Sequence, residues 1–303
     1  MGTGAFAVPT LISLLNSPHF VVAAVSQPDR PSGRGLGIEP TPVKQVASEF
    51  DIPIWQPESL KGEAPREKIK NFKPDIVVVA AYGKILPDWV IGDPPLGAIN
   101  IHGSVLPAYR GAAPVQRAVI NGETKTGVTI LKVAPKVDTG DILLTQTVEI
   151  EPEETSGELA NKLAALGAGL IIPALEAIES GRAVWISQPE AGTDAPKIAK
   201  DEARIDWRTD AVSIKNIVRG LNPNPGAYFI FRNGRVKFWR AATAPGQSEA
   251  RPGTIESLVP AGPVVVCGEG TVFLTGVQPA GKKAMTGAEF IRGYRPIPGE
   301  MLE

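Results

Sequence analysis

The sequence predicts an α/β protein in which an open sheet with helices is followed by a smaller antiparallel β-barrel. Up to about residue 188, apolar or β-branched runs alternate with helix-like segments, which is the pattern of an open α/β sheet. After Asp206 the runs are short and separated by turns such as Asn233-Gly234, which is typical of antiparallel strands in a small barrel. We therefore expect two domains, residues 1–188 and 206–303, joined by a Pro-rich linker over 189–205.

The first domain is expected to contain a strand buried on both faces. Residues 75–81 are a nearly continuous apolar run flanked by Pro74 and Gly83, which suits the interior of a parallel sheet. Shorter strands are predicted at 21–25, 98–101 and 127–133, with helices at 41–49, 58–71, 113–120 and 156–180. Ligands of open α/β sheets bind beyond the carboxyl ends of the strands, so Tyr82-Gly83 and His102-Gly103 are placed on the binding edge.

The second domain is expected to be mostly β. A helix is predicted at 211–220, and strands at 227–232, 236–241, 253–258, 264–267 and 272–276. From Asp206 onward the chain holds 12 Lys/Arg and 8 Asp/Glu, a net charge of +4, against −5 for the remainder. A basic module beside an acidic one points weakly to an anionic partner, although chance variation in surface charge produces the same numbers.

Composition excludes several classes of protein. Hydrophobic residues make up 43% and charged residues 21% of the 303 residues, as in ordinary globular chains. No uncharged apolar run approaches the roughly 18 residues that span a bilayer, and the start lacks the pattern of a signal peptide. One cysteine and two histidines leave no internal disulfide and no Cys- or His-based metal site. We therefore expect a cytoplasmic protein that binds neither a metal nor a membrane.

Three polar residues are candidates for catalysis. Asn100 and His102 alternate on a predicted strand, so both side chains point to the same face. An amide and an imidazole on one face can stabilise a developing oxyanion, and the imidazole can also move a proton near neutral pH. Asp138 follows the strand at 127–133 and is expected at the same sheet edge, where it would orient His102 or accept a proton. Residue chemistry alone leaves acyl-group transfer and hydrolysis both open.

Motifs along nearly the whole chain resemble the folate-dependent formyltransferases. The shared core is Asn100-x-His102-Gly-Ser-x-Leu-Pro107, followed by Asp138-Thr-Gly-Asp141. Segments 2–9, 27–35, 81–87, 110–117, 202–207, 222–228 and 278–285 resemble, more narrowly, the members that formylate methionyl-tRNA. The resemblance implies a Rossmann-like formyltransferase domain, a linker and an OB-like barrel. It also implies transfer of formyl from 10-formyltetrahydrofolate to the amino group of methionine on initiator tRNA.

The resemblance also implies a role for particular residues. It assigns catalysis to Asn100, His102 and Asp138. It assigns folate binding to Ser104, Val105, Leu106 and Pro107, and we expect tRNA contacts at Arg34, Lys282 and Lys283. The implied partners are folate and initiator methionyl-tRNA, and we expect a monomer. Two alternatives stay open, namely another folate-dependent formyltransferase or hydrolase, and a catalytically inactive RNA-binding relative. The basic second domain argues against the former, and the intact Asn/His/Asp set against the latter.

The chain departs from the family pattern at four places. The family has an apolar strand ahead of the Gly2-Thr3 turn, so we expect either that this strand is absent or that the true start lies upstream. Lysines common after Gly35 are replaced by residues 36–39, Leu-Gly-Ile-Glu. Ala108-Tyr109 stands where Arg-Trp is common, and Asn224 where Trp is common. These differences bear on substrate contacts rather than on the reaction.

Overall fold

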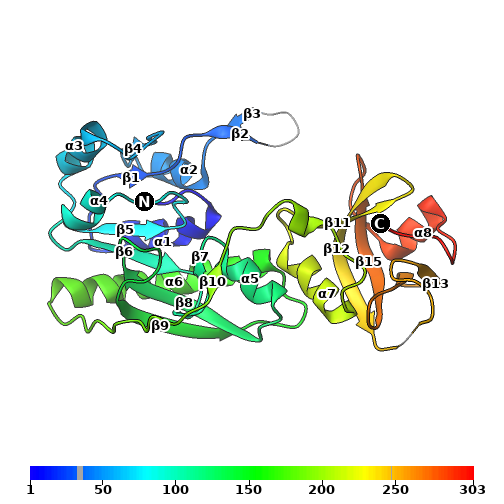
Figure 1. Cartoon of the computed structure of the whole chain (residues 1–303). Helices are drawn as coiled ribbons and strands as arrows, with labels where there is room; N and C mark the ends of the chain where they lie inside the picture. Colours follow the sequence, from blue (N-terminus) through cyan, green and yellow to red (C-terminus); the bar gives the residue numbers. More distant parts are fainter. Residues whose placement is uncertain (33–36, 247) are drawn as a thin grey trace. The chain divides into compact units, whose positions relative to one another are not determined.

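The computed structural model describes residues 1–32, 37–246 and 248–303, and its contacts divide the chain into two compact units (Figure 1). The first unit contains Met1–Pro114, Lys125–Glu149 and Ala160–Pro196. The second contains Val115–Thr124, Ile150–Leu159 and Lys197–Glu303. The first has α/β architecture and the second is built on an antiparallel sheet, as the sequence predicts.

The main sheet of the first unit has four strands in the order β5-β6-β8-β9. Its strands are β5 (Val77–Ala80), β6 (Ala98–His102), β8 (Lys125–Lys132) and β9 (Ile142–Glu149). β5 and β6 are parallel, whereas β8 runs antiparallel to β6, with Asn100 opposite Leu131 and His102 opposite Thr129. β9 was not predicted, because it is an edge strand with several polar, exposed residues in place of an apolar run.

A second, two-stranded parallel sheet pairs β1 (Ala24–Val25) with β4 (Ile54–Trp55), and Met1-Gly2 links it to β5. The Gly2 amide donates to the Val25 carbonyl at 2.9 Å, while the Ala80 amide donates to the Met1 carbonyl at 2.9 Å. Gly2 also forms a parallel bridge with Ala80. These two residues therefore occupy a strand position between β1 and β5. The strand predicted at 21–25 is regular only over its last two residues.

A groove of about 680 Å³ continues from Met1 between the segments that precede β1 and β5. Its walls include residues 21–25 and 74–76, and Leu11 and Leu175 contribute apolar surface. Because the bridge between Gly2 and Ala80 is parallel, an extended chain ahead of Met1 would run toward residues 74–76 along this groove. The Met1 amine is buried and donates to the Val78 carbonyl at 2.6 Å, and burial lowers its pKa to about 5.

We predict that a β-branched apolar extension of about four residues ahead of Met1 raises the melting temperature by several degrees. The extension would bury apolar surface and bond backbone groups of both walls, and each kcal/mol gained shifts Tm by about 2–4 °C at this size. In the unextended chain the unfolded state binds the amine proton more tightly, so stability should rise between about pH 5 and pH 8. The extension should remove this dependence of stability on pH. A Gly-Ser extension of equal length is the control, and equal melting temperatures would refute the prediction.

The helices of the first unit follow the predicted order. α2 (Pro42–Glu49) begins after Thr41, whose hydroxyl accepts from the Lys44 amide. The others are α1 (Val8–Leu15), α3 (Glu63–Phe72), α4 (Asp88–Gly92) and α6 (Ser156–Glu179), whose first turn belongs to the second unit. The short elements are η1 (Ala5–Ala7), β2 (Arg30–Ser32), β3 (Gly37–Glu39), β7 (Arg110–Gly111) and β10 (Asp194–Ala195).

α6 is the one helix in the described part of the chain whose length and composition would allow it to cross a membrane. Core helices of globular proteins pass the same test. Leu159, Leu163, Ile171 and Ala174 are buried, so one side of this helix packs into the core.

The second unit is built on a six-stranded antiparallel sheet. The order is β11 (Ala227–Phe231), β12 (Gly234–Ala244), β15 (Thr271–Pro279), β14 (Gly262–Val266) and β13 (Ile255–Val259), with β16 (Met285–Thr286) paired to β15. Within the described ranges no pairing joins the outer strands β11 and β13, so the closed barrel predicted from the sequence is not confirmed. The helical elements are α5 (Pro114–Ile120), η2 (Asp201–Ala203), α7 (Ala211–Gly220) and α8 (Gly287–Tyr294).

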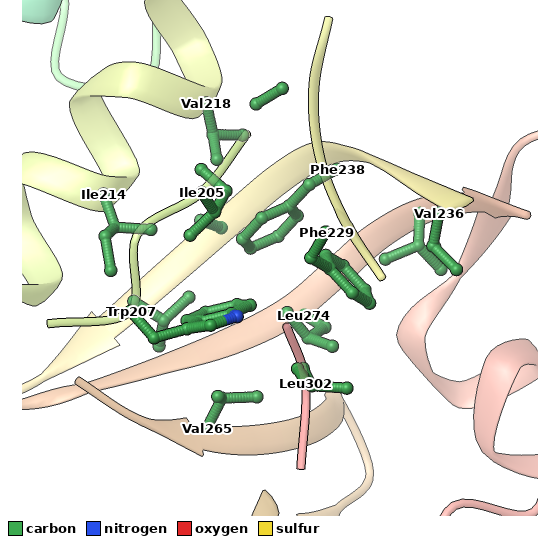
Figure 2. Packing of buried hydrophobic residues seen from close by; sticks show 14 of the residues in the cluster. Ile205, Trp207, Ile214, Val218, Phe229, Val236, Phe238, Val265, Leu274 and Leu302 are labelled. Atoms are coloured by element: carbon green, nitrogen blue, oxygen red, sulfur yellow. The ribbon is translucent and has the colours of Figure 1, made fainter. Parts of the chain in front are cut away.

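Aromatic residues form the centre of this unit's core (Figure 2). The Trp207 ring lies 5.7 Å from the Phe229 ring and 6.4 Å from the Phe238 ring, which are typical centroid distances for packed aromatic pairs. Ile214 and Val218 on α7 cover one side of the cluster in Figure 2. The alternation of buried residues along β11 and β12 leaves the other face of these strands to polar and aromatic side chains.

Two sequence motifs of the predicted family meet in a salt bridge of this unit. Arg117 contacts Glu202 through both terminal nitrogens, at 2.5 and 2.9 Å. The guanidinium lowers the pKa of the Glu202 carboxyl, which also accepts from the Ala199 amide. This fork fixes the chain that leads into η2 against α5.

Candidate active site

β6 places Asn100 and His102 on one face of the main sheet, as their alternation predicts. The His102 side chain is 5% exposed and that of Asp138 11%, so both are close to fully buried. β6 then leads directly into residues 103–107, which carry the predicted folate segment. The site is thus built at the carboxyl end of a central strand, where open α/β sheets bind ligands.

Asp138 is held in this cluster by three groups. Its Oδ1 accepts from Asn100 Nδ2 at 3.2 Å, and its Oδ2 accepts from the Gly111 amide at 2.9 Å. His102 Nδ1 lies 3.4 Å from Oδ2. The structure therefore brings the three predicted catalytic residues together.

The connection that brings Asp138 to Asn100 and His102 differs from the one that the sequence predicts. β8 is antiparallel to β6, so its carboxyl end lies beside the start of β6 and not at the binding edge. The loop after β8 turns back to reach Asn100 and His102, and Asp138 has a φ of 52° within it. Aspartate tolerates this left-handed conformation better than most residues. An alternation of strands and helices cannot reveal this reversal, since the strand pattern is the same in both directions.

The hydrogen-bond partners of His102 determine the role of each ring nitrogen. Nε2 lies 2.8 Å from the Tyr109 carbonyl, which can only accept, so Nε2 must carry a hydrogen. Nδ1 faces the Asp138 carboxylate, which also accepts when ionised. A proton that arrives at Nδ1 would lie between the imidazole and the carboxylate. His102 and Asp138 are therefore placed so that a proton can pass between them.

Two residues that the sequence analysis did not assign hold the Asp138 loop. Gln188 Nε2 donates to the Asp138 carbonyl at 2.9 Å and to the Gly140 carbonyl at 2.7 Å. Gln188 Oε1 accepts from the buried Arg110 at 2.9 Å, and Arg110 also donates to the Pro189 carbonyl. Arg110 stands in a quoted motif, so its buried role could have been suspected. Gln188 lies at the end of the predicted first domain, where no pattern points to it.

The predicted folate segment is fixed beside the cluster. Ser104 Oγ donates to the Ala108 carbonyl at 2.6 Å, and Thr129 on β8 bonds both the Ser104 carbonyl and the Leu106 amide. Val105 and Pro107 are partly exposed, whereas Ser104 and Leu106 are buried. The segment is thus a preformed edge with partly exposed apolar side chains next to the three catalytic candidates. Among the described residues no group of three or more His, Cys, Asp or Glu could hold a metal ion.

The predicted tRNA residues lie elsewhere in the chain. Lys282 and Lys283 are exposed in the turn after β15, in the second unit. Arg34 lies outside the described residues. Leu36 does as well, so the predicted departure at residues 36–39 is described only from Gly37 onward.

Comparison with known proteins assigns a class to this fold and site. The formyl transferase family matches residues 1–175, and the C-terminal domain of formyl transferases matches residues 197–295. The chain is thus a formyltransferase by family.

Relatives of the same length define the family more narrowly. The methionyl-tRNA formyltransferase of Methylobacterium sp. (strain 4-46) is 44% identical over 307 residues, covering 100% of this chain and 97% of the relative. Those of Parvibaculum lavamentivorans and Moorella thermoacetica are 45% and 42% identical over 98% and 97% of their lengths. The chain belongs to the methionyl-tRNA formyltransferase family.

Solved structures share the fold at low sequence identity. A sugar 3N-formyl transferase, WlaRD, has a TM-score of 0.64 at 16% identity, covering 93% of this chain and 97% of that one. HypX from Aquifex aeolicus in complex with tetrahydrofolic acid has a TM-score of 0.60 at 21% identity, covering 81% and 44%. A methionyl-tRNA formyltransferase from Clostridium thermocellum has a TM-score of 0.51 at 20% identity, covering 65% and 86%. These likenesses concern the fold.

Proposed function

We propose that this chain transfers the formyl group of 10-formyltetrahydrofolate to the α-amino group of methionine on initiator tRNA, for translation initiation. The observation that carries the proposal is the buried cluster of Asn100, His102 and Asp138 beside the Ser104–Pro107 segment. The methionyl-tRNA formyltransferases to which the chain is similar over its full length support the acceptor. Folate as formyl carrier is supported by the tetrahydrofolic acid bound to HypX.

In this reaction the amine nitrogen attacks the formyl carbon and forms a C–N bond. The carbonyl oxygen becomes an oxyanion in the tetrahedral intermediate. One amide hydrogen of Asn100 is bonded to Asp138, which leaves the second for the oxyanion. The Nε2 hydrogen of His102 can exchange the Tyr109 carbonyl for the same oxygen.

Proton transfer completes the reaction. The attacking nitrogen becomes positively charged and must lose a proton, which the Asp138–His102 pair takes up. The same pair returns a proton to N10 of the folate as the bond between N10 and the formyl carbon breaks. The products are a formamide on the tRNA and tetrahydrofolate, with no net gain or loss of protons by the enzyme.

The remaining assignments follow from the same reading. Ser104, Val105, Leu106 and Pro107 bind the folate, and the reaction uses no metal. Residues 1–188 form the catalytic domain, 189–205 the linker, and 206–303 an OB-like module that binds tRNA. Arg34, Lys282 and Lys283 contact the tRNA. The enzyme acts as a cytoplasmic monomer without membrane association.

The function is tested with purified protein, 10-formyltetrahydrofolate and methionyl-initiator tRNA. Formylmethionine, released by deacylation, is measured by mass spectrometry, and a reaction without acceptor tRNA is the control. The proposal requires formylmethionine that depends on both substrates. Formate release at the same rate without acceptor would support a hydrolase instead. Formylation of a nucleotide-linked amino sugar would support another folate-dependent formyltransferase, one that acts on sugars. No reaction with tRNA binding intact would support the inactive RNA-binding alternative.

A further inference from the structure

The outer face of β11 and β12 carries two cations, each held over an aromatic ring. Arg235 Cζ lies 3.6 Å from the centroid of Tyr228, and Lys237 Nζ lies 4.9 Å from that of Trp239. Tyr228 is paired with Lys237 in the sheet register. Val236 and Phe238, which alternate with the other three residues, are buried, so Arg235, Lys237 and Trp239 point away from the core. Tyr228 is partly buried on the neighbouring strand. We call Tyr228, Arg235, Lys237 and Trp239 the aromatic–cation face.

The family signature at residues 222–228 shapes this face. Lys237 Nζ donates to the Pro225 carbonyl at 3.1 Å. Gly226 has a φ of 82°, and a Cβ there would come within 2.8 Å of the Trp239 ring and 3.3 Å of Lys237 Nζ. A glycine at this position therefore lets the loop close on the ring and the ammonium group.

Hydrogen bonds connect the face to the loop with the two predicted tRNA lysines. Trp239 Nε1 donates to Gln278 Oε1 at 3.0 Å, and Gln278 Nε2 donates to the Lys282 carbonyl at 2.8 Å. The Ala280 amide donates to the Arg235 carbonyl at 3.0 Å. The loop that holds Lys282 and Lys283 is thus bonded to the residues of this face, and β11, β12 and β15 are neighbours in the sheet.

These cations have no carboxylate partner in the part of the chain that the structure describes. Over residues 1–32, 37–246 and 248–303, no carboxylate forms a salt bridge with Arg235, Lys237, Lys282 or Lys283. Arg232 offers a contrast on the same strand pair, since it also lies over a ring, Phe231, but is paired with Glu300 at 2.7 Å. An arginine with a carboxylate partner stabilises the fold, whereas cations placed by rings and a carbonyl are left free to bind an anion.

We propose that the aromatic–cation face binds the phosphate backbone of the tRNA. This inference rests on the proposed function and deepens it. Rings and the Pro225 carbonyl hold the two cations in place before binding, which reduces the conformational entropy lost on contact with phosphate. A guanidinium stacked flat on Tyr228 still directs its N–H edges outward, where phosphate oxygens can accept. The rings are already covered by cations, so contact with phosphates is favoured over stacking with bases.

The test measures binding of a fluorescent initiator tRNA transcript across about 50–200 mM salt. Arg235→Ala with Lys237→Ala should lower the slope of log K against log salt by roughly 0.7–0.9 for each lost contact, close to two in total. We also expect KM for methionyl-tRNA to rise about tenfold with little change in kcat, as for loss of uniform binding. Arg235→Lys with Lys237→Arg should keep most of the slope. Tyr228→Leu with Trp239→Leu should give an intermediate loss.

The control is Arg251→Ala, which removes one exposed charge ahead of β13, at the opposite edge of the sheet. It should leave the slope near that of the original chain, and an effect equal to that of Arg235→Ala would show that only net charge matters. An unchanged slope in the double variant, with its melting temperature intact, would overturn the proposal and leave the face to another anionic partner. If the original chain formylates methionyl-tRNA and the double variant binds tRNA as well as the original, only the proposed role of the aromatic–cation face is refuted. Salt-dependent tRNA binding without formylation refutes only the proposed function.

Discussion

Replacing His102 by alanine is expected to reduce the rate of formyl transfer by about 10²–10³, because one variant removes both an oxyanion donor and the imidazole that faces the Asp138 carboxylate. Asp138→Asn should reduce it on the same scale. Asparagine tolerates the left-handed backbone at this position and can still accept from the Gly111 amide. It cannot take up the proton, so the loss would report on the charge and not on the loop.

Single-turnover rates with saturating methionyl-tRNA separate the chemical step from binding. The melting temperature and tRNA affinity of both variants should stay close to those of the original chain. A rate within threefold of the original in either variant would contradict the assigned role. If His102→Ala loses activity and also unfolds, Asp138→Asn decides the question, because asparagine is the more conservative replacement in size and hydrogen bonding.

The sequence was sufficient to predict the elements that lie close to the site along the chain. Asn100, His102 and the Ser104–Pro107 segment share one strand and its following loop, so alternation alone places them. The contact with Asp138 was predicted correctly but for an incorrect reason, because β8 runs antiparallel. Strand direction depends on the connection between strands, and the short α5 between β6 and β8 did not reveal it.

Other features depend on contacts between distant residues. Gln188 reaches the carbonyls of Asp138 and Gly140 across about 50 positions, and no local pattern encodes that bond. Closure of a barrel likewise depends on pairing between first and last strands, which local periodicity does not specify. β1 is short, and its neighbour on the side away from β4 is the two-residue segment Met1-Gly2. In each case the local sequence predicts the element but does not reveal the distant segment with which it pairs.

Gly140→Ala should strongly impair the enzyme although Gly140 is outside the proposed catalytic set. A Cβ at this position would lie 1.9 Å from the Lys132 carbonyl oxygen and 2.8 Å from its carbon. Both neighbours are backbone atoms at the end of β8, so the Asp138 loop itself must move. A displacement near 1 Å at a reacting group can cost about 10² in rate. Overpacking of this kind also costs about 1–3 kcal/mol of stability.

Gly169→Ala is the matched control for this substitution, since it adds the same methyl group within the same unit. Gly169 lies inside α6, and a Cβ there would meet no atom within 4 Å. Alanine should stabilise this helix by about 0.5–1 kcal/mol and leave the rate of formyl transfer unchanged. The two variants should therefore move the melting temperature in opposite directions and differ by one to two orders of magnitude in rate. Equal activity in both would mean that the position of Asp138 does not depend on the close approach of Gly140 to β8, and would leave Gln188 as its main support.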